Sequence, residues 1–421
     1  QIEDIYPLSP MQQGMLFHTL YEQQAGDYIN QMCVDVQGLD IERFRTAWQD
    51  ALDAHDVLRS SFVWDGEFQR PVKVIHKHLT VPFSVLDWRD RADLPQAIAA
   101  LALAEQQQGF ELGTAPLLRL VVVRTAADSC RLIYTSHHIL MDGWSNSQLL
   151  GEVLQRYSGQ PPAGGAGRYR DYIQWLARQD AQVSEAFWNA QLADLQEPTR
   201  LARALGAVQP VKGHGERFHV LDEVRTRQLN EFARGHKVTL NTLVQSAWLL
   251  LLQRFTGLDT VSFGATVSGR PAQLAGVEQQ IGLFINTLPV IASPRAEQTL
   301  SAWLQQVQAQ NLALREQEHT PLFEIQRWAG QGGEALFDNI LVFENYPVSE
   351  ALQQGAPQDL RFGEVANHEQ TNYPLTLAVS LDAQLSLHLS FDREQFDGRS
   401  VEQLASQLDH LLQQMVQAPA S

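Results

Sequence analysis

Apolar side chains recur every three or four positions in several stretches of the chain, which is the period of an amphipathic α-helix. Ile41, Phe44, Trp48 and Leu52 form one such stripe within residues 41–55. The same pattern predicts further helices over residues 11–24, 94–108, 144–157, 181–195, 240–255, 300–316 and 399–417. Each of these helices has an apolar face to bury against a core.

Short apolar runs bounded by turn residues predict strands. Two of them, residues 117–124 and 130–138, are joined by the turn-like sequence AADS (residues 126–129) into a hairpin. Further strands are expected over residues 72–76, 83–86, 217–221, 260–268, 337–344, 375–381 and 385–391. Because strands and helices are mixed throughout, the pattern predicts an α/β or α+β fold.

A short pattern occurs once in each half of the chain. In the first half a strand leads through DGWS (residues 142–145) into a helix, and in the second half a strand leads through DGRS (residues 397–400) into another. With the Asp-Gly pairs aligned, Arg393 takes the place of His138. We therefore expect two related halves, a pseudo-dimer with one active site. Chance recurrence of so short a pattern is the alternative.

The clearest break in the first half is residues 159–167, which hold two prolines and four glycines. Such a composition predicts a surface loop near a lobe boundary. We expect an N-terminal lobe of residues 1–175 and a C-terminal lobe of residues 176–421.

Composition narrows the function classes. Apolar residues make up 44% of the 421 residues and charged residues 19%, which is typical of a globular protein. The net charge of −17 repels nucleic acids and anionic membranes. Two cysteines are too few for a disulfide framework, and neither a signal peptide nor a membrane span is evident. We expect a soluble cytoplasmic protein, and the start at Gln1 suggests a segment of a longer polypeptide.

The segment best suited to chemistry is residues 137–145, HHILMDGWS. Successive side chains of a strand point to opposite faces, so His137 and His138 cannot both reach one cleft. We assign proton chemistry to His138, since an imidazole with an ordinary pKa of about 6.5 can accept or relay a proton at neutral pH, and packing to His137. Asp142 precedes a helix, where a carboxylate is more often a cap or an ion-pair partner than a base. Gly143 would allow a backbone conformation or a close substrate approach that a Cβ forbids.

A buried histidine pair followed by an N-capping aspartate would explain the same segment without chemistry. Other catalytic signatures do not compete, since the sequence has no Walker A loop, no G-x-S-x-G elbow and no H-E-x-x-H helix. His76 and His78 could face one side of a strand as metal ligands. Lys77 lies between them and no acidic or cysteine partner is near, so we expect a solvated strand and no metal.

Seven segments resemble, in order, the core motifs of condensation domains from nonribosomal peptide synthetases. They are residues 6–18 (YPLSPMQQGMLFH), 54–62 (AHDVLRSSF), 136–145 (SHHILMDGWS), 169–175 (YRDYIQW), 281–288 (IGLFINTL), 319–324 (HTPLFE) and 372–375 (NYPL). Together they extend over almost the whole chain. This is far more specific than HHxxxDG alone, which other acyltransferases share loosely.

The resemblance implies two lobes of chloramphenicol-acetyltransferase type arranged as a V, with a tunnel between them. It implies no intrinsic cofactor. An upstream donor and a downstream acceptor peptidyl carrier protein would each bring a substrate on a phosphopantetheine arm. An adenylation domain would be a neighbour in the same polypeptide.

The resemblance also assigns roles to individual residues. It pairs Asp142 with an arginine, for which Arg270 in the sequence SGRP is our first choice. Arg59 and Trp144 would help to structure the site. Asn372 would lie along the substrate channel.

The implied reaction is attack of an acceptor amine on a donor thioester, which gives a peptide bond in secondary metabolite biosynthesis. His138 would position the amine or take a proton from it. Two alternatives stay open: an epimerization domain, which shares the fold and the histidine motif but abstracts a Cα proton, and a non-catalytic module that recruits carriers. The sequence does not indicate which amino acids are joined or whether the donor is L or D.

Overall fold

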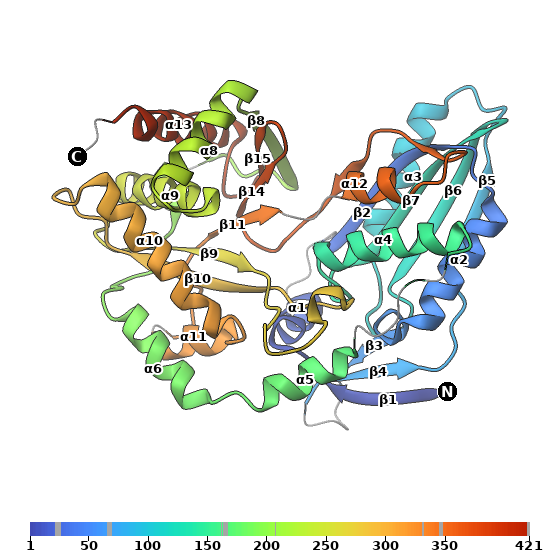
Figure 1. The fold of residues 1–421 in the computed structure, drawn as a ribbon, viewed down its shortest axis with the longest axis horizontal. Coiled ribbons are helices and arrows are strands. Elements are labelled where there is room, and N and C mark those ends of the chain that lie inside the picture. Colours follow the sequence, from blue (N-terminus) through green and yellow to red (C-terminus); the bar gives the residue numbers. More distant parts are fainter. Residues whose placement is uncertain are drawn as a thin grey trace. The chain divides into compact units, whose positions relative to one another are not determined.

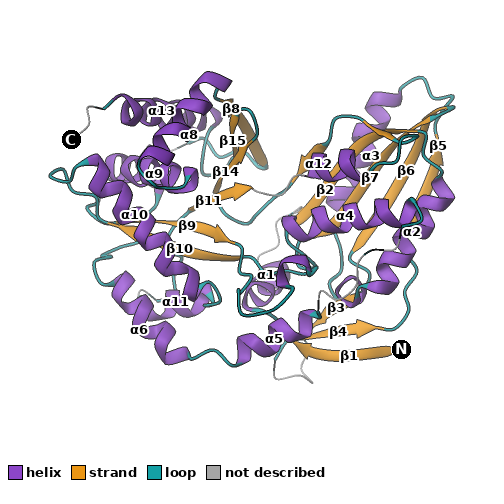
Figure 2. Ribbon diagram, in the orientation of Figure 1, coloured by secondary structure: helices purple, strands orange, loops and turns teal. Residues whose placement is uncertain are grey.

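A computed structural model describes residues 1–21, 27–64, 70–160, 162, 167–206, 208–330, 332–344 and 348–418. Helices and strands are mixed along the chain, which confirms the predicted fold class (Figure 2). The strands are β1 (Ile2–Pro7), β2 (Ile29–Gln37), β3 (Ser60–Val63), β4 (Val72–His76), β5 (Phe83–Asp87), β6 (Leu118–Ala126), β7 (Ser129–His137), β8 (His214–Val220), β9 (Val261–Val267), β10 (Asn286–Ala292), β11 (Asn339–Glu344), β12 (Arg361–Phe362), β13 (Ala366–His368), β14 (Leu375–Leu381) and β15 (Leu385–Asp392).

The α-helices are interspersed with these strands along the chain. They are α1 (Pro10–Tyr21), α2 (Ile41–Ala54), α3 (Leu94–Gln108), α4 (Gly143–Tyr157), α5 (Tyr169–Ala177), α6 (Ala181–Leu192), α7 (Leu201–Leu205), α8 (Glu223–Gly235), α9 (Leu240–Thr256), α10 (Leu300–Leu314), α11 (Leu322–Trp328), α12 (Val348–Gly355) and α13 (Gly398–Gln417). Short 3₁₀ turns are η1 (Asp56–Arg59), η2 (Val277–Gln279) and η3 (Arg315–Gln317).

The chain forms two compact units, whose elements can be followed in Figure 1. Unit 1 consists of Gln1–Gln179, Arg270–Phe284 and Tyr346–Asn372. Unit 2 consists of Asp180–Gly269, Ile285–Asn345 and Tyr373–Ser421.

These units differ from the contiguous lobes 1–175 and 176–421 expected from the sequence, because two later segments return to unit 1. Backbone hydrogen bonds hold them there: the Asp142 N–H donates to the Gly282 carbonyl (3.1 Å), and β12 and β13 pair with β2. Residues 161 and 163–166 of the predicted boundary loop lie outside the described residues.

The larger sheet of unit 1 has the strand order β12-β2-β7-β6-β5, with β13 also paired to β2. β2 and β6 both run antiparallel to β7, whereas β5 runs parallel to β6. Since β6 ends at Ala126 and β7 begins at Ser129, the predicted hairpin is confirmed. A separate sheet has the order β1-β4-β3.

Helices cover both faces of the larger sheet of unit 1 (Figure 1). Val121, Val123 and Ile133 bury one face beneath side chains of α3. Tyr134 points to the other face, where its ring centroid lies 5.1 Å from that of Trp48 on α2. Helix α4 packs beside α2 on this second face, so its first residues lie close to the end of β7.

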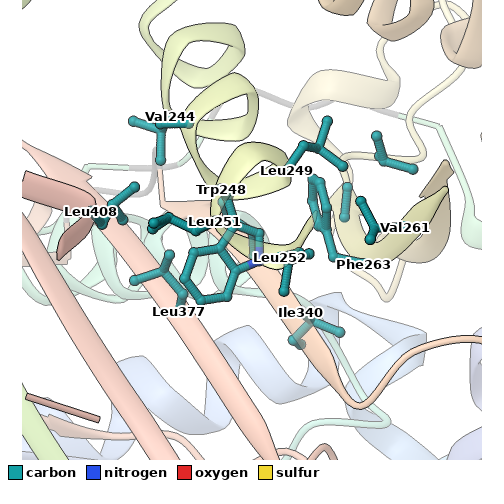
Figure 3. Packing of buried hydrophobic residues seen from close by; sticks show 14 of the residues in the cluster. Val244, Trp248, Leu249, Leu251, Leu252, Val261, Phe263, Ile340, Leu377 and Leu408 are labelled. Carbon is teal, nitrogen blue, oxygen red and sulfur yellow. The ribbon is translucent and has the colours of Figure 1, made fainter. Parts of the chain in front are cut away.

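Unit 2 is built on a sheet of order β10-β9-β11-β14-β15-β8. Its core centres on Trp248 of α9, which is fully buried and donates its indole N–H to Asn339 Oδ1 (2.9 Å). Figure 3 shows Trp248 packed among apolar side chains from α9, β9, β11, β14 and α13.

The two units repeat one topology. The order β2-β7-β6-β5 of unit 1 is matched by β8-β15-β14-β11 in unit 2, with two antiparallel pairs followed by a parallel pair in both. After β7 and β15, Asp142 and Asp397 cap α4 and α13 by accepting the backbone N–H of Ser145 and Ser400. The internal repeat predicted from DGWS and DGRS is therefore confirmed.

The bounds of several helices were predicted closely. Helix α2 begins at Ile41, α3 covers the predicted residues, and α13 ends at Gln417. For α1, residues 22–24 of the prediction lie outside the described residues. The pattern missed α8, because polar side chains fill most of that helix and only Thr226, Leu229 and Ala233 are buried.

Replacing Trp248 with alanine is expected to lower the free energy of unfolding by about 3–5 kcal/mol, because a large ring is removed from a packed core. Urea unfolding measures the effect. Trp64, which is 42% exposed, is the matched control, and Trp64→Ala should change stability by less than about 1 kcal/mol. Equal losses for the two variants would contradict the packing described for Trp248.

Candidate active site

The HHxxxDG segment forms a tight turn between β7 and α4. β7 ends at His137, so His138 lies in the turn and not on the predicted strand. The backbone is fixed at both ends: the His138 N–H donates to the Tyr28 carbonyl (2.8 Å), and the Asp142 N–H donates to the Gly282 carbonyl (3.1 Å). The turn therefore presents His138 on a well-supported backbone.

His137 is a packing residue. Its side chain is buried, Nδ1 accepts the backbone N–H of Ile139 (3.0 Å), and its ring centroid lies 6.3 Å from that of Tyr28. Burial, helped by the neighbouring His138, lowers the pKa of His137 to about 3. The ring is thus neutral at physiological pH, with its proton on Nε2, and it holds the turn in shape.

His138 has a different environment. The residue as a whole is partly exposed, whereas its Nδ1 is buried without a hydrogen-bond partner within the described residues. Burial lowers the pKa of His138 below its ordinary value, although backbone carbonyls and the Asp142 carboxylate nearby oppose this effect. The imidazole is therefore neutral near pH 7, the form that can accept a proton.

Asp142 has no free oxygen to offer a substrate. Oδ1 accepts the Ser145 N–H (2.9 Å) and a guanidinium N–H of Arg270 (3.2 Å), and Oδ2 accepts the Phe284 N–H (3.0 Å). The residue is 1% exposed. Its carboxylate caps α4 and also binds residues 270–284, which we call the strap.

The ion pair expected between Asp142 and Arg270 is present, and Arg270 does more than neutralise it. Its guanidinium also donates to Ser145 Oγ (2.7 Å) and to the carbonyls of Val277 (2.5 Å) and Gln280 (2.9 Å). The same group lies 4.3 Å from the ring centroid of Phe284. Several residues of the strap therefore contact the same Arg270 guanidinium, which stabilises the bent path of this segment.

Side chains of α4 and α5 hold the rest of the strap. The Trp144 indole N–H and the Gln148 amide both donate to the Glu278 carbonyl (3.0 and 2.6 Å). The Tyr169 hydroxyl donates to the Leu283 carbonyl (2.6 Å). Trp144 remains 42% exposed, so its ring is available to a bound molecule.

Asn372 is connected to the histidine turn through Tyr28. The Tyr28 hydroxyl donates to Asn372 Oδ1 (2.7 Å), while its own carbonyl accepts the His138 N–H. Tyr28 has a φ of 62°, a left-handed conformation that a bulky residue seldom adopts and that tends to occur at functional sites.

The two remaining predicted site residues, Gly143 and Arg59, lie on different elements of unit 1. Gly143 is the first residue of α4 and has a helical backbone, so an unusual backbone conformation does not explain the glycine. Arg59 pairs with Glu3 (2.6 Å) and donates to the carbonyls of Leu52 (3.1 Å) and His76 (2.5 Å). It therefore ties α2 to the sheet β1-β4-β3.

Sequence reasoning missed several residues that shape the site. Ser145 was part of the quoted motif, but its hydroxyl role, which includes accepting the Gly282 N–H (3.1 Å), was not foreseen. Gly282 and Phe284 lie in the quoted segment 281–288, yet they act through backbone atoms that no side-chain pattern reveals. Tyr28 carries no sequence signal.

Metal binding and membrane insertion are two other functions that the described residues bear on. Within the described residues, no group of three or more His, Cys, Asp or Glu side chains is placed to hold a metal ion. In the same part of the chain, no helix combines the length and the apolar character needed to cross a membrane.

The alanine variant of Asp142 should be destabilised by about 3–5 kcal/mol, because it removes one member of a buried ion pair. Asp397→Ala is the matched control: Asp397 caps α13 in the same way but is exposed, and loss of a cap costs about 1 kcal/mol. Urea unfolding of both variants makes the comparison. A stable Asp142→Ala with little activity would instead make Asp142 a direct participant in the reaction.

The chain is similar in sequence to parts of much longer proteins. Linear gramicidin synthase subunits D and C of Brevibacillus parabrevis are 42% and 40% identical to the chain over 100% and 99% of its length. The chain spans only 9% and 6% of those two proteins. Surfactin synthase subunit 2 of Bacillus subtilis (strain 168) is 31% identical over the whole chain, which spans 12% of that protein.

Solved structures share the fold at low identity. The condensation domain of the monacolin K polyketide synthase MokA matches with a TM-score of 0.84 and 17% identity, over 100% of this chain and 99% of that one. The four-domain nonribosomal peptide synthetase AB3403 matches with a TM-score of 0.85 and 19% identity, over 100% of this chain and 34% of that one. Since the family model described as "Condensation domain" matches residues 2–421, the chain belongs to the condensation-domain family.

Proposed function

We propose that this domain forms a peptide bond between a donor aminoacyl or peptidyl thioester and an acceptor aminoacyl thioester in nonribosomal peptide synthesis. Both substrates would be tethered by phosphopantetheine to carrier proteins. The observation that carries the proposal is His138: a partly exposed residue whose neutral imidazole has an Nδ1 without a hydrogen-bond partner among the described residues, on a turn that is hydrogen-bonded at both ends.

The chemistry follows from the groups involved. The acceptor amine attacks the thioester carbonyl, a C–N bond forms, the C–S bond breaks, and the donor arm leaves as a thiol that carries a proton. An α-amine has a pKa of about 7.7–8.0, so a fair fraction is already neutral at cellular pH. His138 needs only to orient the amine or to accept its proton as the tetrahedral species forms.

The surrounding residues divide into two groups. His138 and Gly143 would contact the reacting atoms, with Gly143 permitting close approach. Asp142, Arg270, His137 and Trp144 would position the turn. Because protein donors bind both oxygens of the buried Asp142 carboxylate, a role for this group as the base is disfavoured.

The proposal also assigns roles to two further residues, Asn372 and Arg59. Asn372 would lie beside the substrate path, since its partner Tyr28 also binds the backbone of His138. Arg59 would stabilise the framework of unit 1 and would not touch substrate.

The partners would be an upstream donor carrier and a downstream acceptor carrier, with an adenylation domain adjacent in the polypeptide. The similarity to multi-thousand-residue synthase subunits, of which this chain spans a small part, supports such neighbours. We expect no intrinsic cofactor and a cytoplasmic location.

Epimerization is the main competing activity, since it would also use a histidine as a proton acceptor. The two reactions differ in what they need: epimerization acts on one loaded carrier, whereas condensation needs two. If the domain racemises the substrate on a single loaded carrier in the absence of the second carrier, epimerization is its activity and the proposed condensation is wrong.

His138→Ala is expected to lower the rate of peptide-bond formation between two loaded carriers by at least about 100-fold, the usual contribution of a positioned acid–base group. Single-turnover assays measure the rate. Arg393→Ala is the control, because Arg393 holds the matching position in unit 2 and should be dispensable. Near-normal turnover by His138→Ala would refute the proposed role.

The pH dependence of the rate gives a second readout. Because the pKa of His138 is lowered, the neutral form persists to pH values below about 6.5. After correction for protonation of the acceptor amine, the wild-type rate should not fall between pH 8 and about 6.5 and should decline only at lower pH. A decline already between pH 8 and 7 would indicate that the group in use is not His138.

A further inference from the structure

A buried lysine in unit 1 has no place in the chemistry described so far. Lys73 on β4 is 0% exposed, and its Nζ has no hydrogen-bond partner within the described residues. An ammonium removed from water without an acceptor is costly, so the fold must compensate for it in another way.

The compensation comes from three aromatic rings. Tyr6 of β1 and Phe62 of β3 are the cross-strand partners of Lys73, so all three side chains share one face of the sheet β1-β4-β3. Tyr169 of α5 lies against the same ammonium. The Nζ atom is 5.3 Å, 5.8 Å and 4.2 Å from the ring centroids of Tyr6, Phe62 and Tyr169, within the range of cation–π attraction.

Tyr169, the nearest of these rings, also contacts three consecutive strap residues. Its hydroxyl donates to the Leu283 carbonyl (2.6 Å), and its ring centroid lies 5.2 Å from that of Phe284. At Gly282 a Cβ would come within 2.5 Å of the Tyr169 ring, so the strap backbone is pressed against this side chain.

Two of those strap residues bind Asp142 directly. The Gly282 carbonyl accepts the Asp142 N–H (3.1 Å), and the Phe284 N–H donates to Asp142 Oδ2 (3.0 Å). Contacts are therefore continuous from the Lys73 ammonium through Tyr169 and the strap to the turn that carries His138.

We propose that Lys73 is a positioning residue, whose charge holds Tyr169 and through it the strap in the form that supports the turn of His138. This inference rests on the proposed function of His138. Lys73 acts on the reaction only through the strap and does not touch substrate.

The charge of Lys73 can change under ordinary conditions. Burial lowers the pKa of Lys73 to about 7, against the attraction of Asp56. The titratable groups that face it are Tyr6 from β1, Asp56 from η1 and Tyr169 from α5. Burial raises the pKa of both tyrosines, so they stay neutral between pH 6 and 8.5, and Lys73 is the group in this cluster that changes charge there.

The first test compares Lys73→Met, which keeps the apolar stem, with wild type in single-turnover condensation assays at pH 6 and pH 8.5. The wild-type rate should exceed that of the variant by about tenfold at pH 6 and by about twofold or less at pH 8.5, because the wild-type lysine has lost its charge at the higher pH. The KM for the loaded acceptor carrier should stay the same. Protonation of the substrate amine affects both proteins equally and cancels in the ratio.

Lys77→Met is the matched control, since Lys77 is exposed and lies four residues further along the chain. It should match wild type at both pH values. A wild-type to Lys73→Met ratio that does not change with pH would overturn the proposal, because a purely structural lysine would affect both conditions equally.

Hydrogen–deuterium exchange on the wild-type protein tests the same idea without a variant and without catalysis. After correction for the intrinsic effect of pH, the amides of Gly282 and Phe284 should be less protected at pH 8.5 than at pH 6. Unchanged protection would refute the role of Lys73 even if condensation activity is present. Loss of protection in a domain that does not condense would refute the proposed function alone.

Discussion

A buried carboxylate, that of Asp142, organises the turn between β7 and α4 in unit 1. Asp142 accepts hydrogen bonds from the first turn of α4, from the Arg270 guanidinium and from the Phe284 backbone. A carboxylate this deeply buried is tolerated only when its oxygens are fully satisfied. The strap therefore has to lie where it does, and the turn between β7 and α4 is fixed with it.

The internal repeat separates what the motif does for the fold from what it does for the reaction. Asp142 and Asp397 both cap a helix that follows a central strand, so the Asp-Gly pair is a structural device common to both units. In unit 2 the cap is exposed, and Arg393 replaces the histidine. Among the residues that the structure describes, the Asp-Gly pair is accompanied by the histidine, the buried ion pair of Asp142 with Arg270 and the strap in unit 1 only. These are the features that a catalytic role would need in addition to a helix cap.

The cluster of Lys73 with Tyr6, Phe62 and Tyr169 connects the turn, through the strap, to the sheet β1-β4-β3. Strand register alone brings Tyr6, Lys73 and Phe62 together on one face. Tyr169 then serves both the ammonium and the strap. Packing of this kind is cooperative, because moving Tyr169 would disturb both neighbours at once.

Much of this could be predicted from the sequence, but only where side chains carry the signal. The stripe of Ile41, Phe44, Trp48 and Leu52 placed α2, and the Asp-Gly pairs revealed the repeat. The resemblance to condensation domains singled out Arg270 as the partner of Asp142, and the ion pair is present.

The rest depends on information that a sequence pattern does not contain. The Gly282 and Leu283 carbonyls and the Phe284 N–H are backbone groups, which every residue possesses. Lys73 would ordinarily be assigned to the surface, and only the pairing of β1, β4 and β3 shows that it is buried. The return of the strap to unit 1 likewise results from long-range hydrogen bonds rather than from local composition.

The central claim is that Asp142 serves the reaction by holding the turn that carries His138. The most direct test is a double-mutant cycle on the single-turnover condensation rate with His138→Ala, Asp142→Ala and the double variant, each first shown to be folded. If Asp142 acts only through His138, the double variant should be no slower than His138→Ala, within about twofold, since residues that act as a unit are not additive. A further loss of about tenfold or more in the double variant would contradict the account and give Asp142 a catalytic role of its own.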